Sequence, residues 1–134
     1  MESVRAAAVL VAQERPFAQE AVDFMVGPHE GIEYKYRMEK GGSMVYRWAA
    51  TGTVEFDFHG EPVGSPRGYA ESYEMGQKAR ADGAFFAPTT GIHGWYWKNV
   101  GSQNVTVTLT SAGFYSGGIV FSAGGRVERE IPVE

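Results

Sequence analysis

The sequence contains no cysteine, which excludes a disulfide framework, a zinc–thiolate site and a cysteine nucleophile. Positive charge is also scarce, because 12 Lys and Arg stand against 16 Asp and Glu and give a formal net charge of -4. A protein that neutralises a phosphate backbone needs a broad basic surface, so we expect no nucleic-acid partner. There is no run of about 18 or more apolar residues, and we therefore expect no membrane-spanning helix in this sequence.

Catalytic and nucleotide-binding motifs are absent as well. The sequence has no G-x-S-x-G elbow, no H-E-x-x-H pair, no phosphate-binding Gly-Lys-Ser/Thr loop and no dinucleotide fingerprint. The acidic residues of the predicted strands alternate with basic ones, which is typical of a solvated face. We therefore expect a protein that is not an enzyme.

Glycine and aromatic residues are abundant, with 18 Gly and 13% aromatic residues in a chain of 134. Together with many β-branched residues they favour short strands and tight turns over helices. A chain of this length can build one domain with a proper core and is too short for two. We expect residues 1–20 to form a short helix or linker stopped by Pro16, and residues 21–134 to form one β-domain.

Alternation of apolar and polar residues is the dominant pattern of that domain. It is clearest at residues 32–38, where Ile, Tyr and Met alternate with charged residues. The same period places Val54, Phe56 and Phe58 on one face of a strand. Roughly eight such strands, spaced as in all-β domains, predict an antiparallel β-sandwich that is jelly-roll-like or GOLD-like.

Residues 60–82 interrupt the alternation with Gly, Pro, Ser and charged residues. We expect a long loop there, with a short strand inside it at residues 69–75. A loop of this length in a compact domain is usually functional or mobile. This segment is therefore predicted to contribute to a binding rim.

Two of the three histidines, His59 and His93, stand beside glycine at the ends of predicted strands. Because strand ends gather at the rims of a sandwich, we expect these two side chains to meet, with Glu61 or Asp57 nearby. Imidazole and carboxylate together suit zinc, copper or nickel. The sequence thus predicts a divalent transition-metal site at His59, His93 and Glu61; the alternative is that both histidines are ordinary surface or hydrogen-bonding residues.

Aromatic residues suggest a second kind of site. In the run from Trp95 to Trp97 the two tryptophans share one face, which we expect to fill the core, and Tyr96 takes the other face. A carbohydrate- or peptide-binding sandwich that uses Tyr69, Tyr73 and Tyr96 is therefore an alternative function. A small cupin-like metalloenzyme is a third, although its metal would need about three or four inward-facing ligands. Outward strand edges would also allow a homo-oligomer.

Five segments carry motifs in a characteristic order: residues 31–38, 54–62 with its His-Gly-Glu-Pro, 72–74, 93–99 and 105–109. In this order the chain resembles, over about residues 21 to 115, a bacterial family whose members are labelled transmembrane anchor proteins. The tryptophan-containing strand is also similar to GOLD-type extracytoplasmic sandwiches. The family positions that the chain matches are His59, Gly60, Pro62, His93, Gly94, Trp95 and Trp97.

Members of that family carry an N-terminal membrane helix, a variable linker and a β-rich domain outside the cytoplasm. The resemblance therefore implies a periplasmic location and a membrane anchor in the full-length relatives. The membrane helix has no counterpart here, so we expect a trimmed domain or a soluble member. We predict a non-catalytic binding or accessory module whose partner is a metal ion or a membrane protein.

Overall fold

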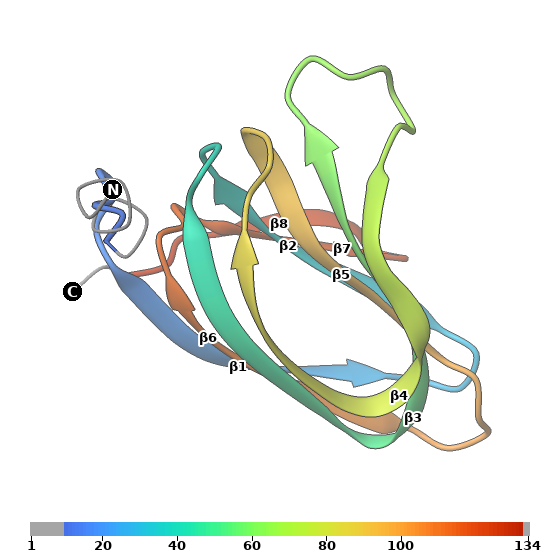
Figure 1. Ribbon diagram of the computed structural model, residues 1–134. Coiled ribbons are helices and arrows are strands. Elements are labelled where there is room, and N and C mark those ends of the chain that lie inside the picture. The colour runs from blue at the N-terminus through green and yellow to red at the C-terminus, as the bar shows by residue number, and fades with distance from the viewer. Residues whose placement is uncertain (1–9, 133–134) are drawn as a thin grey trace.

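The computed structural model describes residues 10–132, and these residues form one antiparallel sheet of eight strands that curls around a core (Figure 1). The predicted all-β class is confirmed, and the sandwich stays a prediction because the strands form one continuous curled sheet. The strands are β1 (Ala18–Val26), β2 (Gly31–Met38), β3 (Ser43–Pro62), β4 (Glu71–Phe86), β5 (Gly91–Asn99), β6 (Val105–Gly113), β7 (Gly118–Ser122) and β8 (Gly125–Arg129).

The predicted N-terminal helix is wrong for the part of it that the structure describes. Residues 10–17 contain no helix, and β1 begins at Ala18. The first nine residues of the predicted helix lie outside the described residues. The helix prediction rested on local propensity alone, and a short helix is marginal unless its apolar face packs on something. No helix among the described residues is suitable for crossing a membrane.

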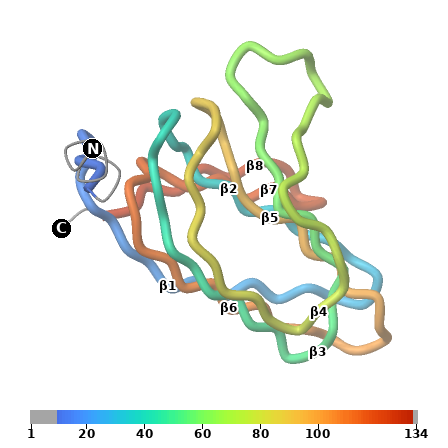
Figure 2. The backbone as a smooth tube through the Cα atoms, in the orientation of Figure 1, coloured from blue at the N-terminus to red at the C-terminus, as the bar shows by residue number. Residues whose placement is uncertain are grey.

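Strand β3 holds the sheet together. One of its edges pairs with β4, while its other edge pairs with β6 over Met44 to Ala50 and with β5 over Val54 to Pro62. The two pairings meet at a register shift between Ala49 and Val54, where β3 and β4 bend together (Figures 1 and 2). The resulting strand order is β1-β6-β3-β5-β2-β7-β8, with β4 added on β3.

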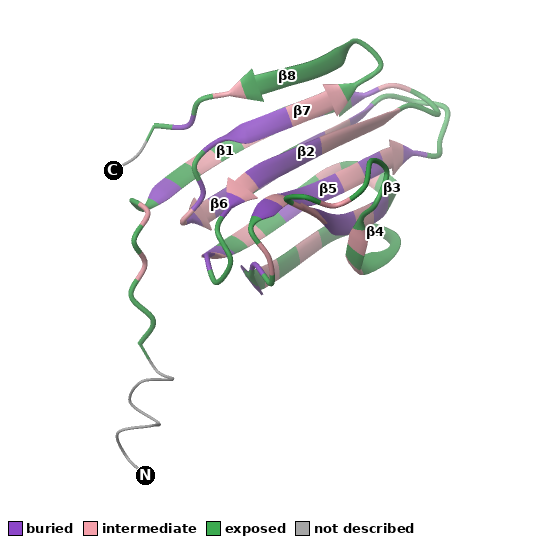
Figure 3. Cartoon of the chain, turned by 90° about the horizontal axis from the view of Figure 1, so that it is seen from above, coloured by how far each residue is buried: buried purple, intermediate pink, exposed green. Residues whose placement is uncertain are grey.

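The concave inner face of the sheet is filled mainly by aromatic side chains. Figure 3 shows the alternation of buried and exposed residues along the strands. Trp95 and Trp97 are buried as predicted and stack on each other with ring centroids 5.7 Å apart. The predicted inward face of β3 is confirmed too. The aromatic residues of the core are Phe24, Tyr34, Tyr36, Trp48, Phe56, Phe58, Phe85, Trp95, Trp97 and Tyr115.

The predicted long loop at residues 60–82 is wrong, because most of it is strand. The connection between β3 and β4 covers only residues 63–70, and β4 then pairs with β3 along almost its whole length. Most side chains of β4 are exposed, and the strand has a neighbour on one edge only. A strand of this kind needs no continuous apolar face, so the period-2 pattern that reveals strands is weak in its sequence.

Candidate functional site

The most unusual part of the molecule is a charged cluster on the outer face of the sheet, where β5 lies between β2 and β3. The register pairs Gly94 of β5 with Lys35 on one side and with His59 on the other, so the three residues form a row across the sheet. A Cβ at position 94 would collide with the Tyr34 carbonyl oxygen and would lie 2.6 Å from the Lys35 Cα. Only glycine fits there, and its missing side chain leaves room above β5 for the two flanking side chains.

Lys35 occupies the middle of this cluster and is only 1% exposed. Its ammonium forms ion pairs with Glu33 and with Glu61, the second at 2.8 Å. It also lies 4.8 Å from the ring centroid of Phe121 on β7. A buried ammonium is stable only when it is paired, and the two carboxylates provide that pairing.

His59 completes the cluster from the β3 side and is also buried. Its Nδ1 donates a hydrogen bond of 3.0 Å to the Asp57 carbonyl oxygen, which leaves Nε2 to face Glu33 Oε1 at 3.4 Å. Two carboxylates, a lysine and an imidazole therefore converge above Gly94.

The two partners affect each other's protonation. The hydrogen bond from His59, together with the nearby Lys35, lowers the pKa of Glu33 to about 2. Desolvation by burial is the largest single influence on the pKa of His59 and lowers it, but the Glu33 carboxylate and the Asp57 carbonyl outweigh it, so the pKa of His59 is raised. Both shifts favour the charged forms of Glu33 and His59.

Three of these residues offer metal ligands. One donor atom from each of Glu33, His59 and Glu61 lies within 4.8 Å of the others. Imidazole nitrogen and carboxylate oxygen form the donor set of zinc and of similar transition metals. Of the predicted metal ligands, the structure therefore brings His59 and Glu61 together and adds Glu33.

His93 does not join them, and the expected meeting of His59 and His93 does not occur in the structure. His93 pairs with Gly60, one position away from His59, so its side chain points to the opposite face of the sheet. There it is fully buried, with Nδ1 3.0 Å from the Tyr73 hydroxyl and Nε2 2.9 Å from the Thr89 carbonyl oxygen. Burial lowers the pKa of His93, which makes it a neutral core residue.

The three predicted ligand-binding tyrosines are dispersed. Tyr69 is exposed in the β3–β4 connection, and its hydroxyl donates to Glu71. Tyr73 packs inward against Phe58 and His93. Tyr96 lies on the outer face, where it lines an open groove of about 620 Å³ with Asp57 and other residues of β3 and β4. These tyrosines do not form one aromatic row.

Sequence reasoning missed Glu33 and Lys35, because the alternation of acidic with basic residues along the strand was interpreted as a solvated face. The usable signal was Gly94, a glycine inside a strand that is otherwise rich in large side chains. Such a glycine marks a place where a backbone or a side chain approaches closely.

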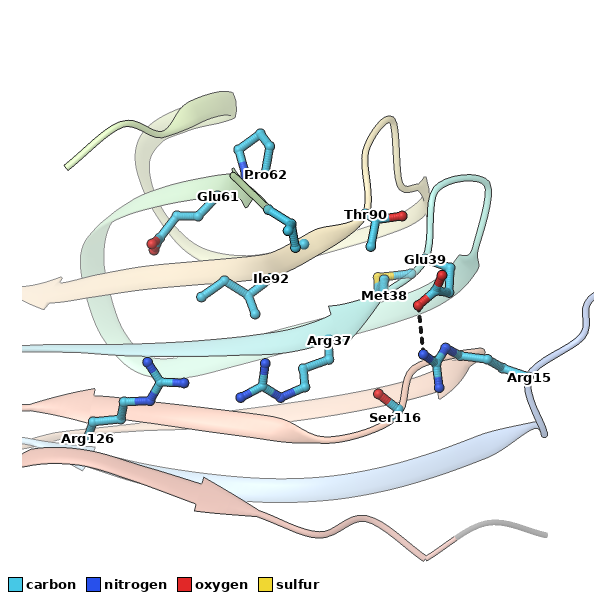
Figure 4. A pocket seen from close by; sticks show the side chains of 12 residues that line it. Arg15, Arg37, Met38, Glu39, Glu61, Pro62, Thr90, Ile92, Ser116 and Arg126 are labelled. Atoms are coloured by element: carbon cyan, nitrogen blue, oxygen red, sulfur yellow. Dashed lines mark hydrogen bonds and ion pairs between the residues drawn. The ribbon is translucent and has the colours of Figure 1, made fainter. Parts of the chain in front are cut away.

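A groove of about 380 Å³ adjoins the cluster and shares Glu61 with it. Arg37 comes from β2, Arg126 from β8, and Arg15 from the segment before β1 (Figure 4). Apolar side chains, among them Met38, Ile92 and Val63, form much of the remaining wall.

No family model and no curated protein matches the chain. Several solved structures are similar to it in fold. PliG of Aeromonas hydrophila, a periplasmic inhibitor of g-type lysozyme, is 18% identical with a TM-score of 0.45, and the match covers 78% of this chain and 91% of the inhibitor.

A protein of the disulfide-linked pili of Bacillus endospore appendages is 10% identical with a TM-score of 0.49, and that match covers 79% of this chain and 94% of the pilus protein. A de novo designed double-stranded β-helix is 15% identical with a TM-score of 0.40, over 69% of this chain and 97% of the design. These similarities concern the fold alone.

Proposed function

We propose that the protein is a non-catalytic binding module that binds a divalent transition metal through Glu33, His59 and Glu61. The observation that carries this proposal is the convergence of their three donor atoms within 4.8 Å. Each bond from zinc to nitrogen or oxygen is about 2 Å long, so a small movement of these side chains brings all three donors onto one ion. A tetrahedral ion would keep its fourth position for water or for a ligand.

The hydrogen bond from His59 Nδ1 to the Asp57 carbonyl supports this proposal. Histidines that bind metals usually donate their second ring nitrogen to a backbone carbonyl or a carboxylate, which fixes the tautomer and the ring orientation. In this arrangement Nε2 is the nitrogen that would bind the metal, after losing the proton that it carries in the charged form of His59.

Lys35 is the competitor for the site. Its ammonium is already paired with both carboxylates, and an arriving metal ion must displace it from them. Breaking these ion pairs costs free energy, so Lys35 weakens the affinity of the site for a metal ion. A metal would bind more tightly if this position carried an uncharged side chain of similar length.

Titration calorimetry with zinc, copper and nickel tests the proposal, starting from metal-free protein. We expect saturable binding by the wild type, loss of that binding in His59→Ala, and tighter binding in Lys35→Met. His29→Asn is the matched control, because His29 is an exposed histidine in a turn outside the cluster. The proposal is wrong if the wild type binds none of the three metals, or if His59→Ala binds as the wild type does.

An extracytoplasmic location is part of the proposal and rests on the resemblance to the membrane-anchored family. A metal ion or a membrane protein is the partner that this resemblance favours. Immunoblotting of osmotic-shock fractions from the native host tests the location. Recovery of the protein with cytoplasmic markers would contradict it.

A further inference from the structure

The groove beside the cluster carries three arginines from three separate parts of the chain. Arg15 precedes β1, Arg37 lies on β2 and Arg126 lies on β8, and Figure 4 draws Arg37 between the other two. Guanidinium groups offer planar pairs of N–H donors that match a carboxylate. Three of them around one groove of about 380 Å³ are an unusual concentration of such donors on an acidic protein.

Two of these arginines are held next to each other by a carboxylate of the protein itself. The two oxygens of Glu128 bind Arg37 at 2.7 Å and Arg126 at 3.2 Å. Glu128 shows directly that this pair of guanidinium groups accepts a bridging carboxylate. Each guanidinium has five N–H donors, so both keep donors that a second carboxylate can use.

Arg15 supplies further donors near Glu39. Its Nη2 binds Glu39 at 2.7 Å, whereas its Nε is buried and has no hydrogen-bond partner among the described residues. A buried donor without a partner costs free energy, and an oxygen of a bound ligand would remove that cost.

The charges of the groove favour an anion. Lys35 and His59 together balance the charges of Glu33 and Glu61, so the carboxylates of Glu39 and Glu128 are left to match the three arginines. Three positive charges minus two negative charges leave one positive charge for a ligand. The apolar walls favour a ligand with a carbon skeleton over an inorganic ion.

We propose that this groove binds a small organic anion with two or more carboxylate groups. One carboxylate would bind at Arg37 and Arg126, a second would bind at Arg15, and the carbon skeleton would lie against Ile92 and Val63. None of the three arginines is a proposed metal ligand, but the groove shares Glu61 with the proposed metal site, so the test uses metal-free protein.

Calorimetric titration of the metal-free protein with tricarballylate, at fixed ionic strength, tests the proposal. We expect saturable binding by the wild type, and binding weaker by at least about tenfold in Arg37→Gln and in Arg126→Gln. Arg47→Gln is the matched control, because Arg47 is an exposed arginine on β3 that pairs with Asp82 and lies outside the groove. It should bind as the wild type does.

Acetate and inorganic phosphate are the comparison ligands. Acetate, with one carboxylate, should bind far more weakly than tricarballylate, and phosphate should too. The proposal fails if tricarballylate shows no saturable binding, or if both groove variants keep wild-type affinity. Phosphate that binds as tightly as tricarballylate would overturn the assignment to organic carboxylates. Thermal melting of each variant identifies a loss of binding that comes from misfolding.

Discussion

The ammonium of Lys35 lies 2.8 Å from the carboxylate of Glu61, although β5 runs between the two strands that carry them. The contact spans β5 because Gly94 places no side chain in its path. The pair therefore links β2 to β3 over the top of a third strand. This link depends on one glycine and on one buried charge.

We predict that Lys35→Met lowers the free energy of unfolding by about 2 kcal/mol, because it leaves Glu33 and Glu61 without their buried cation. The expected loss is below that of a fully buried pair, since both carboxylates keep contact with solvent. Urea denaturation followed by tryptophan fluorescence measures it. Lys40→Met, at an exposed turn position, should change stability little, and equal losses in the two variants would contradict the prediction.

Gly94→Ala should destabilise the protein by about 3 kcal/mol or more, because its Cβ would collide with backbone atoms of Tyr34 and Lys35 rather than with a flexible side chain. Gly101→Ala is the comparison, since a Cβ there meets its nearest atom, Asn99 Oδ1, at 3.5 Å. Thermal melting of both variants measures the two losses of stability. A Gly94→Ala protein as stable as Gly101→Ala would show that β2 and β5 do not approach as closely as described.

The His59–Glu33 pair should give stability a defined dependence on pH. The pKa of Glu33 is lowered from 4.5 to about 2, so its contribution is present above pH 4.5 and is lost as the pH falls toward 2. The pKa of His59 is raised above 6.5, so its contribution is present below pH 6.5 and is lost as the pH rises through the folded-state value. The pair therefore contributes most between pH 4.5 and 6.5.

The difference between the melting temperatures of the wild type and of His59→Asn, measured from pH 3 to pH 9, isolates this contribution from that of other groups. We expect a maximum in the difference between pH 4.5 and 6.5. A difference that does not change with pH would show that the pair has no electrostatic role.

Tyr73→Phe should lower the free energy of unfolding by about 1 kcal/mol. The Nε2 of His93 must donate to the Thr89 carbonyl, so Nδ1 accepts a hydrogen bond from the Tyr73 hydroxyl, and phenylalanine leaves that buried nitrogen without a partner. Tyr69→Phe, in the exposed connection, should have little effect. Chemical denaturation of the two variants measures the difference. If Tyr73→Phe leaves the free energy of unfolding unchanged, the hydrogen bond from Tyr73 to His93 does not contribute to stability.

The inner face of the sheet was predictable from the sequence, whereas the outer face was only partly so. The alternation in β3 identified its buried side, because apolar side chains must leave water whatever their neighbours are. In the alternation of β2, Lys35 occupies a position where a solvent-exposed residue is expected. Its burial depends on Gly94 of β5, which lies about 60 residues further along the sequence. Local patterns do not contain that kind of information.

The prediction about the histidines failed for a related reason. The Gly neighbours correctly indicated close approach, but the expected meeting of His59 and His93 required a register that the sequence does not specify. Pairing His93 with Gly60 instead of with His59 moves the side chain to the other face of the sheet. Glu61 lies beside His59 because the two residues share one face of β3, and the pairings of β5 with β2 and with β3 bring Glu33 to them.

The bent strand β3 is hydrogen-bonded along one edge to β4 and along the other to β6 and then to β5. Both parts of the sheet pair with one continuous backbone, and only residues 51–53 at the bend have no partner strand. The two parts should therefore lose structure together, and the amide protons of residues 44–49 and 54–58, which β3 pairs on both edges, should exchange with solvent more slowly than those of residues 51–53 at the bend.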